Sequence, residues 1–410
     1  MIVLGPGGVG KTTIAAALGI AAARAGCNTG VITIDPAQRL RDALGVGRLT
    51  ARPARIDARR LRAAGLAPDL RLAAMVLDVK RTWDGLVERL VPAAGRRRVL
   101  ENSFYRSLTE QFAGAEAYAA LEQLYELHSA ARFEVEIVDT PPASHAFEFV
   151  EAPANLARLL DSSAARWLFI PYSAANKGVL GLANRAARTV LNQLESFAGL
   201  RTLSSISEFF EAAADAAGAV SERMRKAEAL LHAPSVSFVL VTTAEEDRLR
   251  EAHELLGRMK AHGLRLGAIV LNRIVDQRVF AAMRGTGRNA AGYFDTIAAL
   301  RSAVDAGSTN ARDGAAGKGL ATLLSFLENY GVEARATIRR ASSFARELPA
   351  GTRLAIAPDI GSGAGDLRML AELAAIIADS RASSMVLARD AESPTRASRR
   401  AAGGSRRAAI

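Results

Sequence analysis

Close to its start the chain carries a glycine-rich motif that restricts its fold more than any other feature of the sequence. Residues 5–12 read G-P-G-G-V-G-K-T and match the pattern G-x-x-x-x-G-K-[ST]. A short apolar run, Ile2-Val3-Leu4, precedes the motif, and an Ala-rich helical stretch from Thr12 to Ala25 follows it. A strand, a glycine loop and a helix in this order form the usual context of a phosphate-binding loop. The sequence therefore predicts an α/β domain that binds phosphate groups.

Each part of the motif has an expected role at those phosphates. The glycines allow several backbone N–H groups to converge on the ligand, and the helix that follows adds the positive end of its dipole. Lys11 is expected to reach the β- and γ-phosphates, and the hydroxyl of Thr12 is expected to bind Mg²⁺. The candidate nucleotide-binding residues of the loop are Gly5, Gly7, Gly8, Val9, Gly10, Lys11, Thr12 and Thr13.

Further short apolar runs predict the remaining strands, at residues 31–35, 135–139, 238–242, 268–272 and 354–357. Helical patterns lie between them, including one from about Leu70 to His128 and an uninterrupted one from about Asn155 to Leu231. Strands of four to six apolar residues that alternate with helices indicate a parallel sheet covered on both faces. The predicted fold class is an α/β P-loop NTPase with a mostly parallel sheet, helices on both faces and an inserted helical subdomain.

Composition shifts suggest the domain boundaries. We expect residues 1–154 to form the first part of the ATPase core, with a basic helical segment, and residues 155–231 to form the helical insert. Residues 232–380 would complete the core. Residues 381–410 lack any helical or strand period and are rich in Ala, Ser, Gly and Arg, so they predict a disordered basic tail.

A formal net charge of +11 favours binding to nucleic acid or to an acidic surface. The excess of basic over acidic residues, however, is concentrated in two segments of the chain. Residues 48–98 hold 13 Lys or Arg against 5 Asp or Glu, and residues 381–410 hold 7 Arg against 2 acids. The rest of the chain is therefore nearly neutral. A solvated surface explains these basic segments at least as well as a polyanion ligand does, so nucleic acid stays an alternative partner and not the expected one.

The single cysteine, Cys27, excludes an internal disulfide framework and any metal site built on paired cysteines. It fits a reducing compartment. The chain shows no signal peptide before its first strand and no apolar run of the roughly 18 residues that a membrane span needs. These observations predict a cytoplasmic protein without a transmembrane segment.

Two aspartates follow predicted strands beside the loop. Asp35 ends the second strand, in D-P-A, and Asp139 ends the third, in D-T-P-P. The carboxyl ends of parallel strands face the crevice where ligands bind. An aspartate there can position the attacking water, and another can hold the Mg²⁺ shell.

Three motifs of the chain together resemble the arsenite-pump ATPase (ArsA) family of dimeric P-loop ATPases. In chain order they are the phosphate loop, D-P-A-Q-R-L-R-D-A-L from Asp35, and D-T-P-P-A-S-H-A-F-E-F from Asp139. That family includes the eukaryotic ATPase that targets tail-anchored membrane proteins, and a wider class also holds ParA and MinD. The resemblance covers about residues 1–380. It implies ATP and Mg²⁺ as cofactors, and catalytic roles for Asp35, Lys11 and Asp139.

Further roles follow from the resemblance residue by residue. Asp35 matches the first switch aspartate, which activates water, and Asp139 matches the acid of the second switch motif, whose histidine falls on His145. Asn272, in V-L-N-R-I, matches the asparagine that reads adenine, and Pro358 matches the proline of the loop that closes over adenine. Thr12 and Asp139 are the candidate Mg²⁺-binding residues, Asp139 through water.

Departures from the family pattern affect the function. The family loop usually carries a lysine that reaches the partner subunit's phosphates, and Pro6 occupies that position here. We therefore expect either slow hydrolysis or a substitute cation, for which Arg39 is the candidate. With one cysteine the chain lacks both the clustered cysteines of metalloid-transporting members and the zinc-binding pairs of the targeting ATPase, so we do not expect metalloid transport. Met224 is the only methionine between residues 155 and 231, so the sequence shows no Met-rich groove for a client.

Three functions remain open from the sequence. The first is an ArsA-type ATPase that works as a homodimer, because each chain has one phosphate loop, and couples hydrolysis to an unknown client protein or small molecule. The second is a ParA- or MinD-like positioning ATPase that binds DNA or a membrane. The third is a nucleotide-dependent scaffold with negligible turnover.

Overall fold

The computed structural model describes residues 1–34, 39–47, 49–111, 115–141, 147, 150–152, 200–274, 299, 301–302, 315–359 and 366–379. Several sequence predictions lie outside these residues: Asp35, His145, the first part of the predicted insert at 155–199, and the tail at 381–410. None of the described helices is long and apolar enough to cross a membrane.

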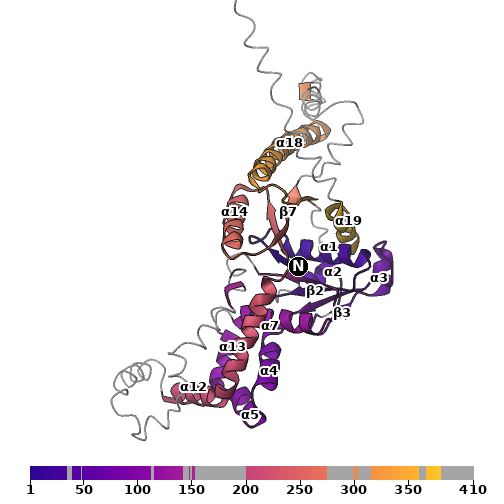
Figure 1. Cartoon of the computed structure of the whole chain (residues 1–410). Helices are drawn as coiled ribbons and strands as arrows, with labels where there is room; N and C mark the ends of the chain where they lie inside the picture. The colour runs from indigo at the N-terminus through magenta and orange to yellow at the C-terminus, as the bar shows by residue number, and fades with distance from the viewer. Residues whose placement is uncertain are drawn as a thin grey trace, which may run out of the picture.

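The centre of the molecule is an eight-stranded sheet (Figure 1). Its strands are β1 (Ile2–Leu4), β2 (Thr29–Thr33), β3 (Ala54–Arg55), β4 (Leu72–Val76), β5 (Val135–Asp139), β6 (Phe238–Thr243), β7 (Leu266–Ile274) and β8 (Leu354–Pro358). Their order in the sheet is β3-β4-β2-β5-β1-β6-β7-β8. The described pairings are parallel, except for the antiparallel pair of β3 and β4 at one edge. The predicted α/β class with a mostly parallel sheet is confirmed.

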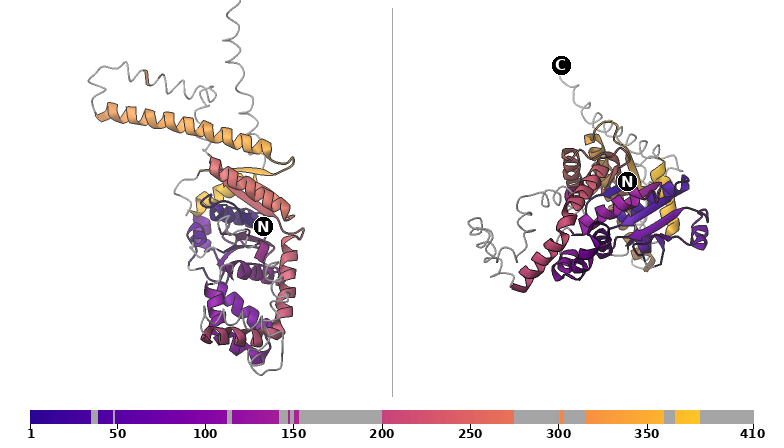
Figure 2. Two further views of the ribbon diagram at one scale, coloured as in Figure 1. Left: turned by 90° about the vertical axis from the view of Figure 1, so that its left-hand side faces the viewer. Right: turned by 60° about the horizontal axis from the view of Figure 1, so that its bottom comes forward.

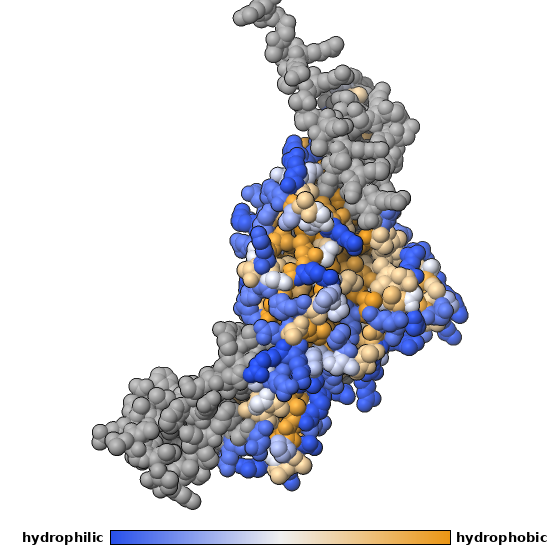
Figure 3. All heavy atoms as spheres, in the orientation of Figure 1, coloured by the Kyte–Doolittle hydropathy of each residue, from blue (hydrophilic) through white to orange (hydrophobic). Residues whose placement is uncertain are grey.

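Helices cover both faces of the sheet because alternate residues of the central strands point to opposite sides. Val3, Val31 and Ile137 pack with α1 (Lys11–Arg24), α2 (Arg39–Leu44), α3 (Ala58–Ala63) and α19 (Leu367–Ala378). Their neighbours Ile32 and Val138 pack on the other side with α7 (Ala115–Ser129), α13 (Ala217–Leu231), α14 (Glu246–Ala261) and the end of α18 (Ala315–Glu347). Figure 3 shows apolar residues gathered in the middle of one face and hydrophilic residues around them.

One predicted element is wrong. The helical pattern expected from about Leu70 to His128 begins instead with strand β4, whose first four residues are buried. The run L-A-A-M-V contains good helix formers and has no period that would separate strand from helix. It becomes a strand because it pairs in parallel with β2 and antiparallel with β3, and such pairing overrides local propensity.

A group of helices lies beside the sheet (Figure 1): α4 (Val79–Leu90), α5 (Ala93–Glu101), α6 (Ser103–Gln111), α7, α12 (Leu200–Ala213), a short 3₁₀ turn (Ala214–Ala216) and α13. Phe209 of α12 contacts the rings of Phe104 and Tyr105 in α6, at centroid distances of 5.5 and 6.1 Å. The described part of the predicted insert therefore packs against helices that precede β5. The predicted boundaries at residues 154 and 231 stay predictions.

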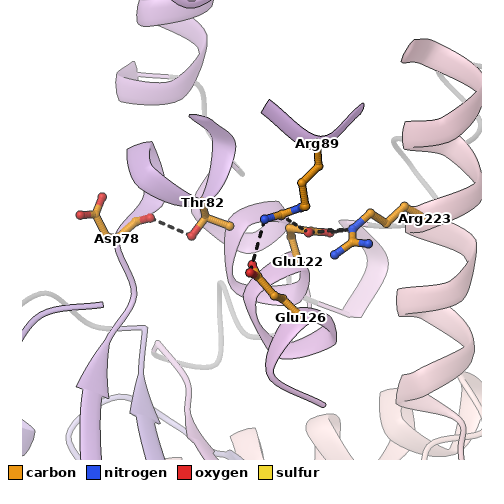
Figure 4. A network of polar contacts seen from close by, with 6 residues as sticks. All are labelled: Asp78, Thr82, Arg89, Glu122, Glu126 and Arg223. Atoms are coloured by element: carbon orange, nitrogen blue, oxygen red, sulfur yellow. Dashed lines mark hydrogen bonds and ion pairs between the residues drawn. The ribbon is translucent and has the colours of Figure 1, made fainter. Parts of the chain in front are cut away.

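A buried carboxylate joins three of these helices (Figure 4). Glu122 of α7 is 2% exposed and accepts hydrogen bonds from Arg89 of α4 at 2.9 Å and from Arg223 of α13 at 2.7 Å. Arg89 also pairs with Glu126, at 3.3 Å. Two guanidinium groups on one carboxylate satisfy its buried oxygens, so these contacts tie α4 and α13 to the helix that leads into β5.

Candidate nucleotide-binding site

The predicted phosphate loop connects β1 to α1, and two of its glycines are required by its geometry. A Cβ atom on Gly5 would lie 2.1 Å from the carbonyl oxygen of Val241 in β6, so only glycine lets the loop run this close to the neighbouring strand. Gly10 caps α1 with φ 90° and ψ 30°, a left-handed conformation that glycine adopts without strain. No acidic residue lies in the first turn of α1, so the helix itself carries no carboxylate that would neutralise the positive end of its dipole.

Lys11, the first residue of α1, is 7% exposed and its side chain lies against the loop. Its Nζ donates hydrogen bonds to the carbonyl oxygens of Gly5 at 3.0 Å and Pro6 at 2.9 Å. The ammonium group is therefore held within the concave loop. This is where the sequence predicts it to meet phosphate oxygens.

The carboxylate of Asp139 lies at the start of α1, as its position at the end of β5 predicts. Its Oδ2 accepts hydrogen bonds from the hydroxyl groups of Thr12, at 2.8 Å, and Thr33 of β2, at 3.0 Å. Asp139 is 1% exposed. The structure thus brings the two candidate Mg²⁺-binding residues, Thr12 and Asp139, into direct contact.

These residues fit a nucleotide with Mg²⁺. Mg²⁺ takes hard oxygen ligands, and a hydroxyl beside a carboxylate offers them at the end of the phosphate loop. At Gly5 the loop backbone lies so close to β6 that a side chain would not fit. The ammonium group of Lys11 supplies positive charge inside the loop. An anion with an associated divalent cation therefore matches the donors and charges present.

The structure assigns Asn272 a contact that sequence reasoning missed. Asn272, in β7, is 5% exposed, and its Nδ2 donates a 2.7 Å hydrogen bond to the carbonyl oxygen of Val9 in the phosphate loop. The resemblance had pointed to adenine alone for this residue. The signal available in the sequence was a polar residue at the end of the predicted strand 268–272, but its target depends on the order of strands in the sheet.

The other predicted residues occupy the same edge of the sheet or its surroundings. Thr13 is half-buried in the first turn of α1, and Pro358 ends β8 in register with Ile274 of β7. Arg39 begins α2 and is exposed. The roles of Thr13, Pro358 and Arg39 at a nucleotide stay predictions, as does that of Asp35, which lies outside the described residues.

In sequence, the chain is similar to known ATPases. A family model described as "Anion-transporting ATPase" matches residues 1–210, about half of the chain. The chain is 27% identical over 202 residues to a protein of Babesia bovis named "ATPase ASNA1 homolog", covering 48% of this chain and 49% of that protein. It is 22% identical over 289 residues to a protein of Aquifex aeolicus that is provisionally named an arsenical pump-driving ATPase, covering 67% of this chain and 63% of that protein.

A third relative, from Halobacterium salinarum and provisionally given the same kind of name, is 28% identical over 162 residues, which are 38% of this chain and 24% of that protein. The chain thus spans less than two thirds of the length of each of these relatives. The matched region contains the phosphate loop, β2 and β5.

Proposed function

Because the chain belongs to the anion-transporting ATPase family, we propose that it binds ATP with Mg²⁺ and hydrolyses it to ADP and phosphate. The observation that carries this proposal is the contact of Thr12 with Asp139 beside a loop that encloses Lys11. In P-loop ATPases the hydroxyl of the loop and a strand-end aspartate hold Mg²⁺, and the lysine binds the β- and γ-phosphates.

Each residue has a task in this reaction. Thr12 and Asp139 would hold the Mg²⁺, Asp139 through a bound water, and the metal would neutralise charge on the phosphate oxygens. Lys11 would exchange the carbonyls of Gly5 and Pro6 for phosphate oxygens, where its charge stabilises the transition state. The resemblance supports Asp35 as the residue that orients the attacking water.

The same proposal includes a homodimer. One phosphate loop per chain supports this, since in the ArsA-type arrangement each site is completed by the partner subunit. Asn272 and Pro358 would contact the adenine, and opening of the dimer after hydrolysis would release a client protein or small molecule. Pro6 replaces the lysine that would cross to the partner, so we expect either slow turnover or a substitute cation, for which Arg39 is the candidate.

Phosphate release and ATP binding in the presence of Mg²⁺ test the proposal. Lys11→Ala is expected to lower the turnover by about 10²–10³-fold, since it removes one preorganised charge from the transition state. Lys260→Ala, an exposed lysine in α14, is the matched control and should keep the wild-type rate. If the wild-type chain binds no ATP, the proposal is wrong.

The proline at position 6 supports a second candidate function, that of a scaffold that binds nucleotide with negligible turnover. Without a lysine that reaches across to the partner, the site can bind ATP and change conformation with little hydrolysis. Tight ATP binding together with a wild-type turnover no higher than that of Lys11→Ala would favour the scaffold over the ATPase.

A further inference from the structure

The phosphate loop is supported from a strand that is not its sequence neighbour. After β1, the loop passes over the end of β6, where Gly5 lies against Val241. On the far side of β6, β7 places Asn272 in register with Thr243. From there the Asn272 amide reaches back to the loop and donates to the carbonyl oxygen of Val9, at 2.7 Å.

The fit between Asn272 and the loop is close. A Cβ atom on Gly10 would lie 2.4 Å from the Nδ2 atom of Asn272, so the amide fills the space that a side chain at position 10 would occupy. Both the amide and the Val9 carbonyl are removed from solvent, with Asn272 5% exposed and Val9 1% exposed. A buried carbonyl without a donor is costly, so this hydrogen bond helps to determine the loop conformation.

The backbone of β7 is distorted at this residue. The pairing of β7 with β8 shifts in register between Leu271 and Ile274, and Arg273 has φ 56°, an uncommon value for a residue other than glycine. Irregularities of this kind redirect side chains near functional sites. Here the distortion immediately follows the residue that contacts the phosphate loop.

We infer that Asn272 is a positioning residue for the phosphates: it holds the Val9–Gly10 segment in the conformation in which its N–H groups face the ligand. This inference rests on the proposed function for the identity of the ligand. It differs from an adenine contact because the effect is on the loop, and it therefore extends to ligands that have no base.

Tripolyphosphate separates the two roles, because it has the phosphates of ATP without adenine or ribose. With Asn272→Ala, the Kd values of Mg²⁺-tripolyphosphate and Mg²⁺-ATP, measured by calorimetry, are each expected to rise about three- to tenfold, the range for one lost hydrogen bond. Weaker ATP binding with unchanged tripolyphosphate binding would overturn the inference, since Asn272 would then act on the base alone.

Thr243→Val is the matched control. Thr243 is opposite Asn272 in β6 and 3% exposed, and its hydroxyl has no hydrogen-bond partner among the described residues, so this variant should bind both ligands as the wild type does. Asn272→Ser, whose side chain is too short to reach Val9, is the second variant and should repeat the effect of Asn272→Ala if the latter does not fold.

Hydrogen exchange without ligand tests the inference separately from the proposed function. Amides of residues 5–12 are expected to exchange faster in Asn272→Ser than in Thr243→Val, while those of β6 stay unchanged. If the wild-type chain binds neither ligand, the proposed function fails and the exchange result alone decides the inference. Equal exchange of the loop in both variants contradicts it.

Discussion

At the scale of single residues, the site is built from polar side chains near the carboxyl ends of different strands and at the start of α1. Asp139 of β5 accepts from Thr33 of β2 and from Thr12 of α1, and Asn272 of β7 donates to the loop. Thr140 adds a 2.7 Å hydrogen bond to the carbonyl oxygen of Val3 in β1. Each of these contacts joins segments that are distant in sequence, so the strand ends and the loop hold one another in place.

Glu136, in the same strand as Asp139, makes stability depend on pH. Burial raises the pKa of its carboxyl group from 4.5 to about 7, and the nearby ammonium group of Met1 opposes this shift only in part. The folded chain therefore keeps a proton that the unfolded chain loses between pH 4.5 and 7. The free energy of unfolding contributed by this group is fully present below pH 4.5 and is lost as the pH rises through 7.

We therefore expect Glu136→Gln to become more stable relative to the wild type as the pH rises. Between pH 4.5 and 7 the difference in the free energy of unfolding should grow by on the order of 2–3 kcal/mol. Urea denaturation at a series of pH values measures it. Glu134→Gln, which also removes one carboxylate but from an exposed site, is the control. A constant difference across this range would contradict the expected shift.

At the scale of elements, α18 combines two environments along one helix. Its apolar and small residues recur with alternating spacings of three and four, at positions 320, 323, 327, 330, 334, 337, 341 and 344. In the C-terminal half this stripe is buried: Ala341 is 1% and Phe344 2% exposed. In the N-terminal half the helix extends away from the sheet (Figure 2), and Leu323 is 52% exposed. One period therefore runs through both a core segment and a surface segment.

Replacing a phenylalanine by alanine should therefore destabilise the chain more in the C-terminal half of α18 than in its N-terminal half. Phe344→Ala removes a ring packed against His253, with centroids 4.9 Å apart, and is expected to lower the free energy of unfolding by about 3–5 kcal/mol. Phe326→Ala changes a side chain in the N-terminal half that is 62% exposed and should cost about 0.5 kcal/mol or less. Urea unfolding of both variants provides the measurement. Equal losses would mean that the exposed half of α18 is packed in solution.

At the scale of the whole molecule, the sheet gathers residues from position 5 to position 358 along one edge. The strand order places β5 and β6 on either side of β1, so the loop after β1 lies between Asp139 and the strands that carry Asn272 and Pro358. Ligands of open α/β sheets bind at the carboxyl ends of the strands. The part of the chain that the structure describes therefore presents such a site around the phosphate loop.

If that site is completed by a second copy, Mg²⁺-ATP should change the mass in solution. Sedimentation velocity at saturating Mg²⁺-ATP is expected to show about twice the mass found without nucleotide, since ATP binding to the dimer shifts the equilibrium toward it. Lys11→Ala should keep the nucleotide-free mass, and Lys260→Ala should behave as the wild type. A wild-type mass that does not change with nucleotide argues against an ATP-dependent homodimer.

Much of this arrangement is predictable from the sequence, and the predictions that are wrong or missing share one cause. The glycine motif and the apolar runs before Asp139 and within residues 238–242 predicted elements that the structure confirms, because these signals are local. The sequence pattern predicts a helix where β4 forms, and it gives no sign of the contact of Asn272 with Val9. The formation of β4 and the contact of Asn272 both depend on the order of the strands in the sheet.

Thus the sequence by itself determined the class of the fold and the phosphate loop, because backbone freedom at glycine, helix dipoles and apolar periodicity act within a few residues. Only the tertiary structure decided the strand order, the pairing that makes β4 a strand, the joining of Thr12, Thr33 and Asp139, and the support of the loop by Asn272. These features need contacts between segments that are up to 263 residues apart, and no local preference specifies them.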